Sequence, residues 1–359
     1  MAWRPILVVC FPAIVFAQQA LTLDGAVRMA LESHPLVASG RESIVAARGL
    51  ERQARLTFNP RLNMQVENLR IPRAEPFVYG QDTDNFAFLQ QTFETAGKRS
   101  LRGEVAARQI RRNELELAIL ERNIRLRVTE AWWRALAAQR TRDLIVETLK
   151  TFEQTVEYHR VRVKEGAMAE ADLIRVQVEA GRFSLAANEA ELEEAQARIG
   201  LFREMGRTSF PEVRLEGLLE PPASDPVWPP VEQALSRRPE IQLARALLDQ
   251  ANARTRLEEA NARPNIDILG GYKRTNGFDT ALAGLQFDLP VRNRNQGNIE
   301  AASAEARAAR ANLAAAEALV EAETRAARVE FETRRQQVRD YLPRLLSQAE
   351  ETARIARGA

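Results

Sequence analysis

The chain has 359 residues, of which 28% are charged and 6% aromatic, and its formal net charge at pH 7 is +2. Because the chain is nearly neutral and has no aromatic and basic platform, nucleic-acid binding is not expected. Beyond residue 17 the sequence contains no stretch of about 18 apolar residues, which excludes a transmembrane helix. If the chain crosses a membrane, it must do so with β-strands.

The N-terminus has the pattern of a secretory signal peptide over 1–17. Arg4 precedes an apolar run over 6–16, and the small residue Ala17 suits a cleavage site. Cys10 is the only cysteine and lies inside this run without a lipoprotein pattern around it. The mature chain would therefore contain no thiol, which fits an oxidising compartment and excludes disulfides and cysteine-ligated metals.

An internal repeat follows, and it determines the predicted architecture. The segment 30–35 aligns with 234–239 at an offset of 204 residues, and the same offset aligns 59–64 with 263–268, so that two prolines stay in register. A linker rich in proline and glycine separates the two copies. The predicted organisation is a first repeat over 18–210, a linker over 211–230 and a second repeat over 231–359.

Within each repeat the apolar period changes from helical to 2 and back. Leu62, Met64 and Val66 alternate with polar residues, and Leu89-Gln90 corresponds to Leu285-Gln286 in the second repeat. Phe86 and Phe88 continue the alternation before Phe93, and Ile266, Ile268, Phe287 and Leu289 do so in repeat two. The predicted strands span about 60–69, 84–93, 264–273 and 280–289.

Strands of this length, apolar on one face and polar on the other, are typical of outer-membrane barrels, although two hairpins on a soluble sheet show the same pattern. Four strands cannot close a barrel, so a membrane function requires several copies of the chain.

Long heptad patterns follow each predicted hairpin. An unbroken ladder runs from Ile110 through Leu117 and Ile124 to Phe152, and a second runs from Ile299 to Ala327. Such ladders indicate helices packed along one another as in coiled coils. The predicted long helices span about 98–164, 172–205 and 297–358, and the first would measure about 100 Å at 1.5 Å per residue.

Three motifs resemble one known family. Leu23-Asp24-Gly25-Ala26 near the start, Gln91–Arg99 after the first hairpin and Leu289–Gly297 after the second are similar to segments of TolC-like outer-membrane efflux proteins. The resemblance covers essentially the whole mature chain and is strongest to the branch of cobalt–zinc–cadmium type heavy-metal efflux. It implies a mainly α fold with membrane β-strands, in which three protomers form one 12-stranded β-barrel continuing into a periplasmic α-helical barrel.

The resemblance also implies a function without catalysis or cofactors. The expected protein is an outer-membrane channel subunit of a Gram-negative bacterium, a passive exit duct in a tripartite efflux system, with heavy-metal cations as candidate cargo. The implied partners are two further copies of the chain, a periplasmic adaptor, an inner-membrane pump and outer-membrane lipid. His34 and His159 have no neighbours at metal-ligand spacing, so no metal site is expected. The alternatives are the periplasmic adaptor itself and a coiled-coil envelope protein.

Two groups of residues are candidate sites. A turn between two long helices is expected to bind the adaptor at the periplasmic tip, with Gly166 as a left-handed helix stop and Asp172 as a cap for the returning helix. Acidic residues there would form rings in a trimer, which favour cations if they face the lumen. The residues of this tip are Lys164, Glu165, Gly166, Ala167, Met168, Glu170 and Asp172.

The second group lies where strand passes to helix, at the predicted periplasmic rim. Its cations are expected to meet lipid headgroups or the interior; alternatively, Gly97 and Gly297 turn the chain and the cations are solvated. The residues are Gly97, Lys98, Arg99, Arg292, Arg294 and Gly297.

Repeat two is shorter than repeat one. Aligning Arg142-Asp143 with Arg339-Asp340 places Ala359 just before the counterpart of Gly166. By resemblance to the family, the chain is expected to be C-terminally incomplete, with its last helix missing.

Overall fold

The computed structural model describes residues 20–69, 76–220, 227–228 and 230–358, so the predicted signal peptide over 1–17 lies outside the described residues. The chain divides into two compact units. Unit 1 consists of Met1–Ala38 and Leu120–Ala223, and unit 2 of Ser39–Ile119 and Ser224–Ala359. Each unit therefore combines segments that are far apart in the sequence, and the boundaries of the units do not follow those of the two repeats.

The expected fold class, mainly helical with four strands, is confirmed. None of the described helices is both long and apolar enough to span a bilayer. The helices are α1 (Leu23–Ser33), α2 (Pro35–Ala54), α3 (Tyr79–Asp82), α4 (Lys98–Lys164), α5 (Glu170–Glu204), α6 (Val231–Arg237), α7 (Pro239–Asn261), α8 (Gln296–Gln336), the π-helical turn η1 (Gln337–Tyr341) and α9 (Leu342–Gly358). The strands are β1 (Arg61–Glu67), β2 (Asp84–Phe93), β3 (Ile266–Thr275) and β4 (Phe278–Gln286).

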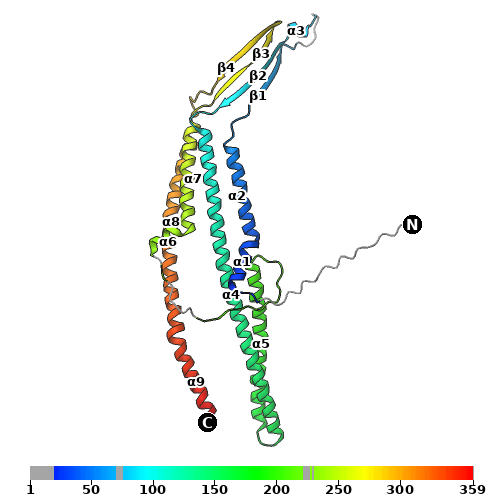
Figure 1. The fold of residues 1–359 in the computed structure, drawn as a ribbon, viewed down its shortest axis with the longest axis vertical. Coiled ribbons are helices and arrows are strands. Elements are labelled where there is room, and N and C mark those ends of the chain that lie inside the picture. The colour runs from blue at the N-terminus through cyan, green and yellow to red at the C-terminus, as the bar shows by residue number, and fades with distance from the viewer. Residues whose placement is uncertain (1–19, 70–75, 221–226, 229, 359) are drawn as a thin grey trace, which may run out of the picture. The chain divides into compact units, whose positions relative to one another are not determined.

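In unit 1, α5 folds back along the second half of α4 (Figure 1). The rings of Phe152 and Phe183 stack across this hairpin with centroids 4.6 Å apart, as the heptad ladders indicate. Gln139 is buried in α4 and makes two hydrogen bonds to the backbone of Leu215, of 2.8 and 3.1 Å. Trp132 of α4 is also buried, and its Nε1 donates to the Leu21 carbonyl at 3.4 Å. The hydrogen bonds of Gln139 fix the segment after α5 against α4.

His34 ends α1, and its Nδ1 accepts a hydrogen bond of 3.1 Å from the backbone N–H of Leu36. Burial lowers the pKa of this imidazole below its ordinary value, and the nearby positive charge of Arg127 lowers it further. His34 is therefore neutral at pH 7 and acts as part of the core of unit 1.

In unit 2, the four strands form one antiparallel sheet in the order β1-β2-β3-β4 (Figure 1). Leu62 lies opposite Leu89, Gln91 opposite Ile268, and Ile268 opposite Leu285. Because side chains alternate along a strand, these residues share one apolar face. Both β1 and β4 are edge strands, so each has one row of backbone groups without a partner strand in this sheet.

The opposite face of the sheet is mostly polar, but it includes three aromatic residues, Phe86, Phe88 and Phe278. Phe88 pairs with Asn63 and Phe86 with Gln65, so both rings lie on the polar side rather than with Leu62 and Met64. Gly271 faces Phe88, and a Cβ at this glycine would come within 2.4 Å of the Phe88 Cα. The glycine is needed because β2 and the Phe88 side chain occupy the space of a side chain.

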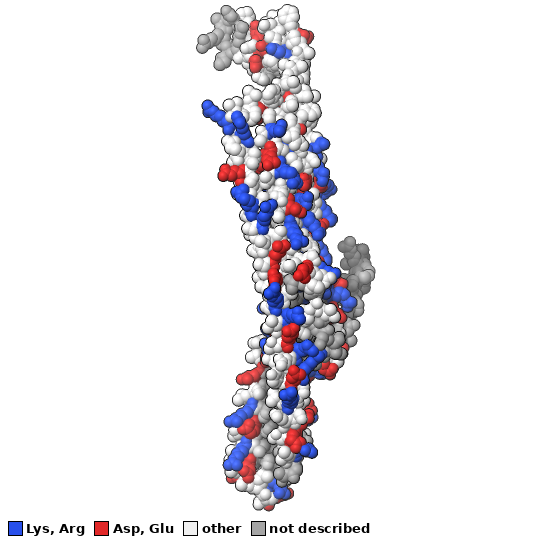
Figure 2. Space-filling model, turned by 90° about the vertical axis from the view of Figure 1, so that its left-hand side faces the viewer, with Lys and Arg blue, Asp and Glu red and all other residues white. Residues whose placement is uncertain are grey.

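The helices of unit 2 are joined by charged and polar side chains. Arg256 on α7 bonds to Glu104 on α4 at 2.6 Å, and Arg245 on α7 pairs with Glu317 on α8 at 3.3 Å. The hydrogen bond from Arg256 is the largest cause that lowers the pKa of the Glu104 carboxyl. Figure 2 shows the same mixture on one face of the molecule, where cations and anions lie side by side on the helices and the strands carry few charges.

Candidate functional site: the strand-to-helix junctions and the hairpin tip

The first junction connects β2 to α4 through a tight turn. Ala96 and Gly97 both have left-handed backbone conformations, with φ of 53° and 69°. The helix then starts at Lys98, whose N–H donates to the carbonyl of Thr95 at 3.2 Å. A glycine suits this position because other residues adopt positive φ only at a cost.

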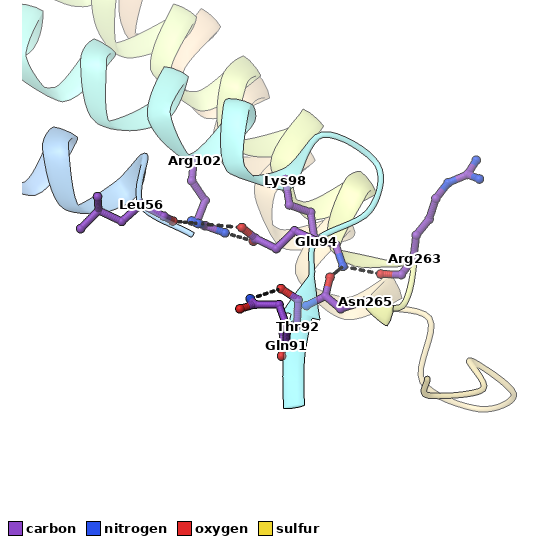
Figure 3. A network of polar contacts seen from close by, with 8 residues as sticks. All are labelled: Leu56, Gln91, Thr92, Glu94, Lys98, Arg102, Arg263 and Asn265. Atoms are coloured by element: carbon purple, nitrogen blue, oxygen red, sulfur yellow. Dashed lines mark hydrogen bonds and ion pairs between the residues drawn. The ribbon is translucent and has the colours of Figure 1, made fainter. Parts of the chain in front are cut away.

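The Lys98 side chain is buried, with 7% of its surface exposed. Its ammonium donates to the backbone oxygen of Arg263 at 2.5 Å and to Oδ1 of Asn265 at 2.6 Å (Figure 3). Burial lowers the pKa of Lys98, and the charge of Glu94 opposes this effect. Lys98 therefore joins the junction of repeat one to the α7–β3 turn of repeat two.

An ion pair lies beside Lys98 in the same junction. Arg102 donates through both terminal nitrogens to the carboxylate of Glu94, and it donates to the Leu56 carbonyl at 3.3 Å (Figure 3). Its guanidinium also lies over the ring of Phe58. Arg102 thus connects the start of α4 to the segment that leads into β1.

These contacts change the interpretation of the predicted rim in repeat one. Lys98 does lie at the strand-to-helix transition, but its buried ammonium is neither solvated nor available to a lipid headgroup, because it already donates to two protein oxygens. Arg99 is exposed at the next position and remains available. A surface groove of 580 Å³ beside it is lined by residues that include Phe58, Thr92 and Glu94.

The second junction, from β4 to α8, is built differently. Asn295 takes the left-handed conformation, with φ of 60°, and its Nδ2 donates to the Glu258 carboxylate at 2.8 Å. Arg292 and Arg294 are exposed, and the Arg294 Nε donates only to the nearby Pro290 carbonyl, at 3.2 Å. The expected turn at Gly297 is wrong: this glycine lies in the first turn of α8, and Asn295 supplies the turn.

The two junctions establish which residues correspond in the two repeats. Gly97 and Asn295 are the left-handed residues, and Lys98 and Gln296 are the first residues of the long helices. Both comparisons give an offset of 198 residues. The sequence alignment of Leu89 with Leu285 is therefore wrong by two residues at this end of the hairpin, and Phe287 is the structural counterpart of Leu89.

The hairpin tip between α4 and α5 has the predicted helix stop. Gly166 has φ of 72°, its N–H donates to the Val163 carbonyl, and the Ala167 N–H donates to the Arg162 carbonyl. This pair of bonds is the Schellman arrangement, which satisfies the last carbonyls of a helix. The tip residues Lys164, Glu165, Ala167 and Glu170 are exposed.

The predicted cap at Asp172 is wrong. The N-cap of α5 is Ala169, which makes no side-chain capping bond, and Asp172 is the third residue of the helix. Its carboxylate pairs with Arg175 one turn further along, at 3.5 Å. A negative charge in the first turn is favourable next to the helix N-terminus, so Asp172 stabilises α5 through its charge.

The functional residues that the sequence did not reveal are Glu94, Arg102 and Asn265. The sequence does not show the geometry of the turn that separates Glu94 from Arg102, and Asn265 is nearly 170 residues from Lys98. The one sequence signal that could have pointed to Asn265 is the alignment of 59–64 with 263–268, because it places a turn at this residue. Among the described residues, no three side chains of His, Cys, Asp or Glu are grouped so that they could hold a metal ion.

Comparison with known proteins gives three kinds of match. Residues 231–358 match the family model described as outer membrane efflux protein. The chain is 26% identical over 293 residues to the cobalt-zinc-cadmium resistance protein CzcC of Cupriavidus metallidurans, covering 80% of this chain and 68% of that protein. It is 25% identical to the nickel-cobalt-cadmium resistance protein NccC of Alcaligenes xylosoxydans xylosoxydans, covering 84% and 66%. The chain thus spans about two thirds of the length of these relatives.

The fold is also similar to solved structures. The open state of the MtrE outer membrane channel of Neisseria gonorrhoeae superposes with a TM-score of 0.70 at 20% identity, covering 93% of this chain and 78% of that one.

Proposed function

Because the chain belongs to the outer membrane efflux protein family of TolC-like channels, we propose that it is one subunit of an outer-membrane efflux channel. In this proposal three copies assemble, their sheets together form the wall of the channel in the membrane, and their long helices extend into the periplasm. Substrate enters from an inner-membrane pump through a periplasmic adaptor, and the subunit itself performs no catalysis.

The observation that carries the proposal is the construction of the sheet. Met64 in β1 and Leu285 in β4, the two edge strands, are 78% and 69% exposed, and both lie on the apolar side. Exposure of such an apolar face to water is unfavourable, whereas lipid solvates it. Two free edges in one sheet also require partner strands, because unpaired backbone groups are unfavourable in a bilayer.

The helices carry a second apolar surface that supports assembly. Along α5, exposed apolar residues recur at a spacing of seven, and they are distinct from Phe183 and the other residues that pack on α4. A helix with two apolar stripes is suited to a neighbour on each side. The exposed stripe consists of Ile174, Val178, Leu185, Leu192 and Ile199.

The tip and the outer cations have separate proposed functions. The exposed turn around Gly166, with Lys164, Glu165 and Glu170, offers charged side chains to an adaptor. Arg99, Arg292 and Arg294 are the exposed cations of the junctions, placed to meet anionic lipid headgroups. Lys98 is excluded from this second function by its burial.

The names of the matched relatives point to heavy-metal cations as the cargo. One matched protein is named for resistance to cobalt, zinc and cadmium, and another for resistance to nickel, cobalt and cadmium. A duct makes few specific contacts with what passes through it, so this assignment depends on the relatives and needs a direct test.

The test is a strain that lacks the gene. Complementation with the chain should restore growth on cobalt, zinc, cadmium or nickel salts, and a variant with Gly166→Val and Glu170→Ala should complement poorly although it reaches the outer membrane. If the deletion strain is sensitive to drugs but resists metals normally, the metal assignment is wrong while the channel function stands. If the chain fractionates as a soluble periplasmic protein or with the inner membrane, the channel function is wrong and the adaptor alternative is favoured.

A further inference from the structure

We propose that β1 of one copy pairs with residues 286–292 of the next copy in one defined register, in which Leu62 lies opposite Val291. The proposal rests on the channel function above and adds the residues of the contact between copies. The starting point is that β1 and β4 are the two edges of the sheet and that each lacks a partner strand on its outer side.

The register follows from the pairing that the chain already contains. At the contact between the repeats, β2 pairs with β3 so that Phe93 lies opposite Ile266. The structural counterpart of Phe93 in repeat two is Val291, at the offset of 198 residues that the two junctions share. The counterpart of Ile266 in repeat one is Leu62, at the offset of 204 residues. If a second copy repeats this contact, Val291 lies opposite Leu62.

The side chains that this register brings together are compatible. Met64 lies opposite Leu289 and Val66 opposite Phe287, so three consecutive pairs on the apolar face join apolar residues. These side chains are exposed in the isolated chain. Cross-strand pairs of large apolar residues stabilise a sheet. The pairing also extends β4, which ends at Gln286 in the isolated chain, to Arg292.

An unpartnered buried group lies at the same edge. The Nδ2 of Asn63 in β1 is buried and has no hydrogen-bond partner in the isolated chain. In the proposed register Asp288 of the next copy lies opposite Gln65, diagonal to Asn63, on the same face of the sheet. Diagonal neighbours are within reach of longer side chains, so a second copy can supply the acceptor that this amide lacks.

A competing register follows from the sequence alignment of Leu89 with Leu285. If Leu285 were the counterpart of Leu89, as the sequence alignment has it, Leu62 would lie opposite Leu289 and the contact would shift by two residues. The apolar face would be preserved in both registers. Only the residues in direct opposition distinguish them.

Disulfide trapping tests the register, in a background with Cys10→Ser. Within one chain, β1 and β4 are three strand spacings apart, about 14 Å, so a bond between them must join two copies. Met64→Cys with Leu289→Cys and Leu62→Cys with Val291→Cys should each give covalent oligomers up to trimer on denaturing, non-reducing gels. Leu62→Cys with Leu289→Cys should give little, because diagonal positions are too far apart for a disulfide.

The control is Met64→Cys with Ala87→Cys, a pair within one chain, which should oxidise and remain monomeric. Efficient trapping by Leu62→Cys with Leu289→Cys in place of the other two pairs would overturn the proposed register but leave the channel function intact. If the parent chain in the outer-membrane fraction yields no oligomer with an amine-reactive crosslinker, both the register and the channel function are wrong.

Discussion

The two strand-to-helix junctions share one backbone feature and differ in their surroundings. In each, a left-handed residue, Gly97 or Asn295, directly precedes the first residue of a long helix, and Ala96 is a second left-handed residue in the first junction. In the first junction Lys98 is buried and donates to the α7–β3 turn, whereas Arg292 and Arg294 in the second are exposed. The first junction lies beside the other repeat, and the second follows an edge strand.

The difference shows that the neighbour of each junction determines whether its cations are buried and hydrogen-bonded or exposed. Lys98, which lies beside another part of the same chain, binds that part, whereas Arg292 and Arg294, which follow an edge strand, stay exposed. Substitutions in the two junctions should therefore have unequal effects. Three experiments on the junctions test this comparison, and a fourth tests the neighbouring α4–α7 contact.

The largest effect is expected for Lys98→Met. The change leaves the Arg263 carbonyl and the Asn265 amide oxygen without their donor, which should lower the free energy of unfolding by about 1.5–3 kcal/mol. Arg294→Met, the control, removes an exposed cation and should change it by less than about 0.5 kcal/mol. Urea unfolding in detergent, followed by tryptophan fluorescence, measures both. Equal losses would contradict the difference between the junctions.

Glu94→Gln is expected to have the next largest effect. The Glu94 side chain is 9% exposed, and its loss of charge leaves the Arg102 guanidinium, which is 30% exposed, with a weaker partner. Because solvent still reaches Arg102, we expect a loss of about 1–2 kcal/mol. Glu300→Gln on the exposed surface of α8 is the matched control. Equal losses of unfolding free energy for the two variants in the same experiment would show that this ion pair does not stabilise the chain.

The two junction glycines should respond to alanine with opposite signs. Gly97→Ala places a Cβ on a left-handed residue and should destabilise the chain by about 1 kcal/mol, although no atom lies within 4 Å of that Cβ. Gly297→Ala lies in the helix and should stabilise it by up to about 0.5 kcal/mol. The temperature at which the oligomer dissociates on gels compares them. If both substitutions shifted the dissociation temperature in the same direction, the backbone of one junction would differ from the conformation described above.

A smaller effect of pH is expected from the α4–α7 contact next to the first junction. The Glu104 carboxyl has a pKa below its ordinary value of 4.5, mainly because Arg256 donates a hydrogen bond to it. Its contribution to stability is therefore complete above pH 4.5 and is lost as the pH falls through the lowered pKa. Unfolding midpoints of Glu104→Gln should fall less than those of the parent chain between pH 5 and pH 3, as ordinary carboxyl titration spans about this range. Parallel curves would exclude this carboxyl as a source of acid sensitivity.

The sequence predicted the regular elements well because their periods are strong. The ladder from Ile110 to Phe152 predicts the helix that contains it, α4, and the alternation at Leu62, Met64 and Val66 predicts β1. Gly166 was found as a helix stop because few other residues favour a positive φ. Features that depend on local spacing alone could therefore be predicted.

Features that depend on distant neighbours could not be predicted. Nothing near Lys98 in the sequence indicates that it is buried, since its acceptors at Arg263 and Asn265 come from the other repeat. The alternation at Phe86 and Phe88 does not show which face of the sheet these rings occupy, because that depends on the residues they oppose in β1. The sequence around Asp172 does not distinguish a cap from a first-turn residue, because acidic residues are common in both positions.

The most direct test of the central claim is the state of the protein in the outer membrane. Protein extracted from isolated outer membranes should have the mass of three chains by native mass spectrometry, and it should form ion-conducting channels in a planar lipid bilayer. A monomer, or a trimer that conducts no ions even after truncation of the tip around Gly166, would contradict the claim that this chain forms an efflux channel.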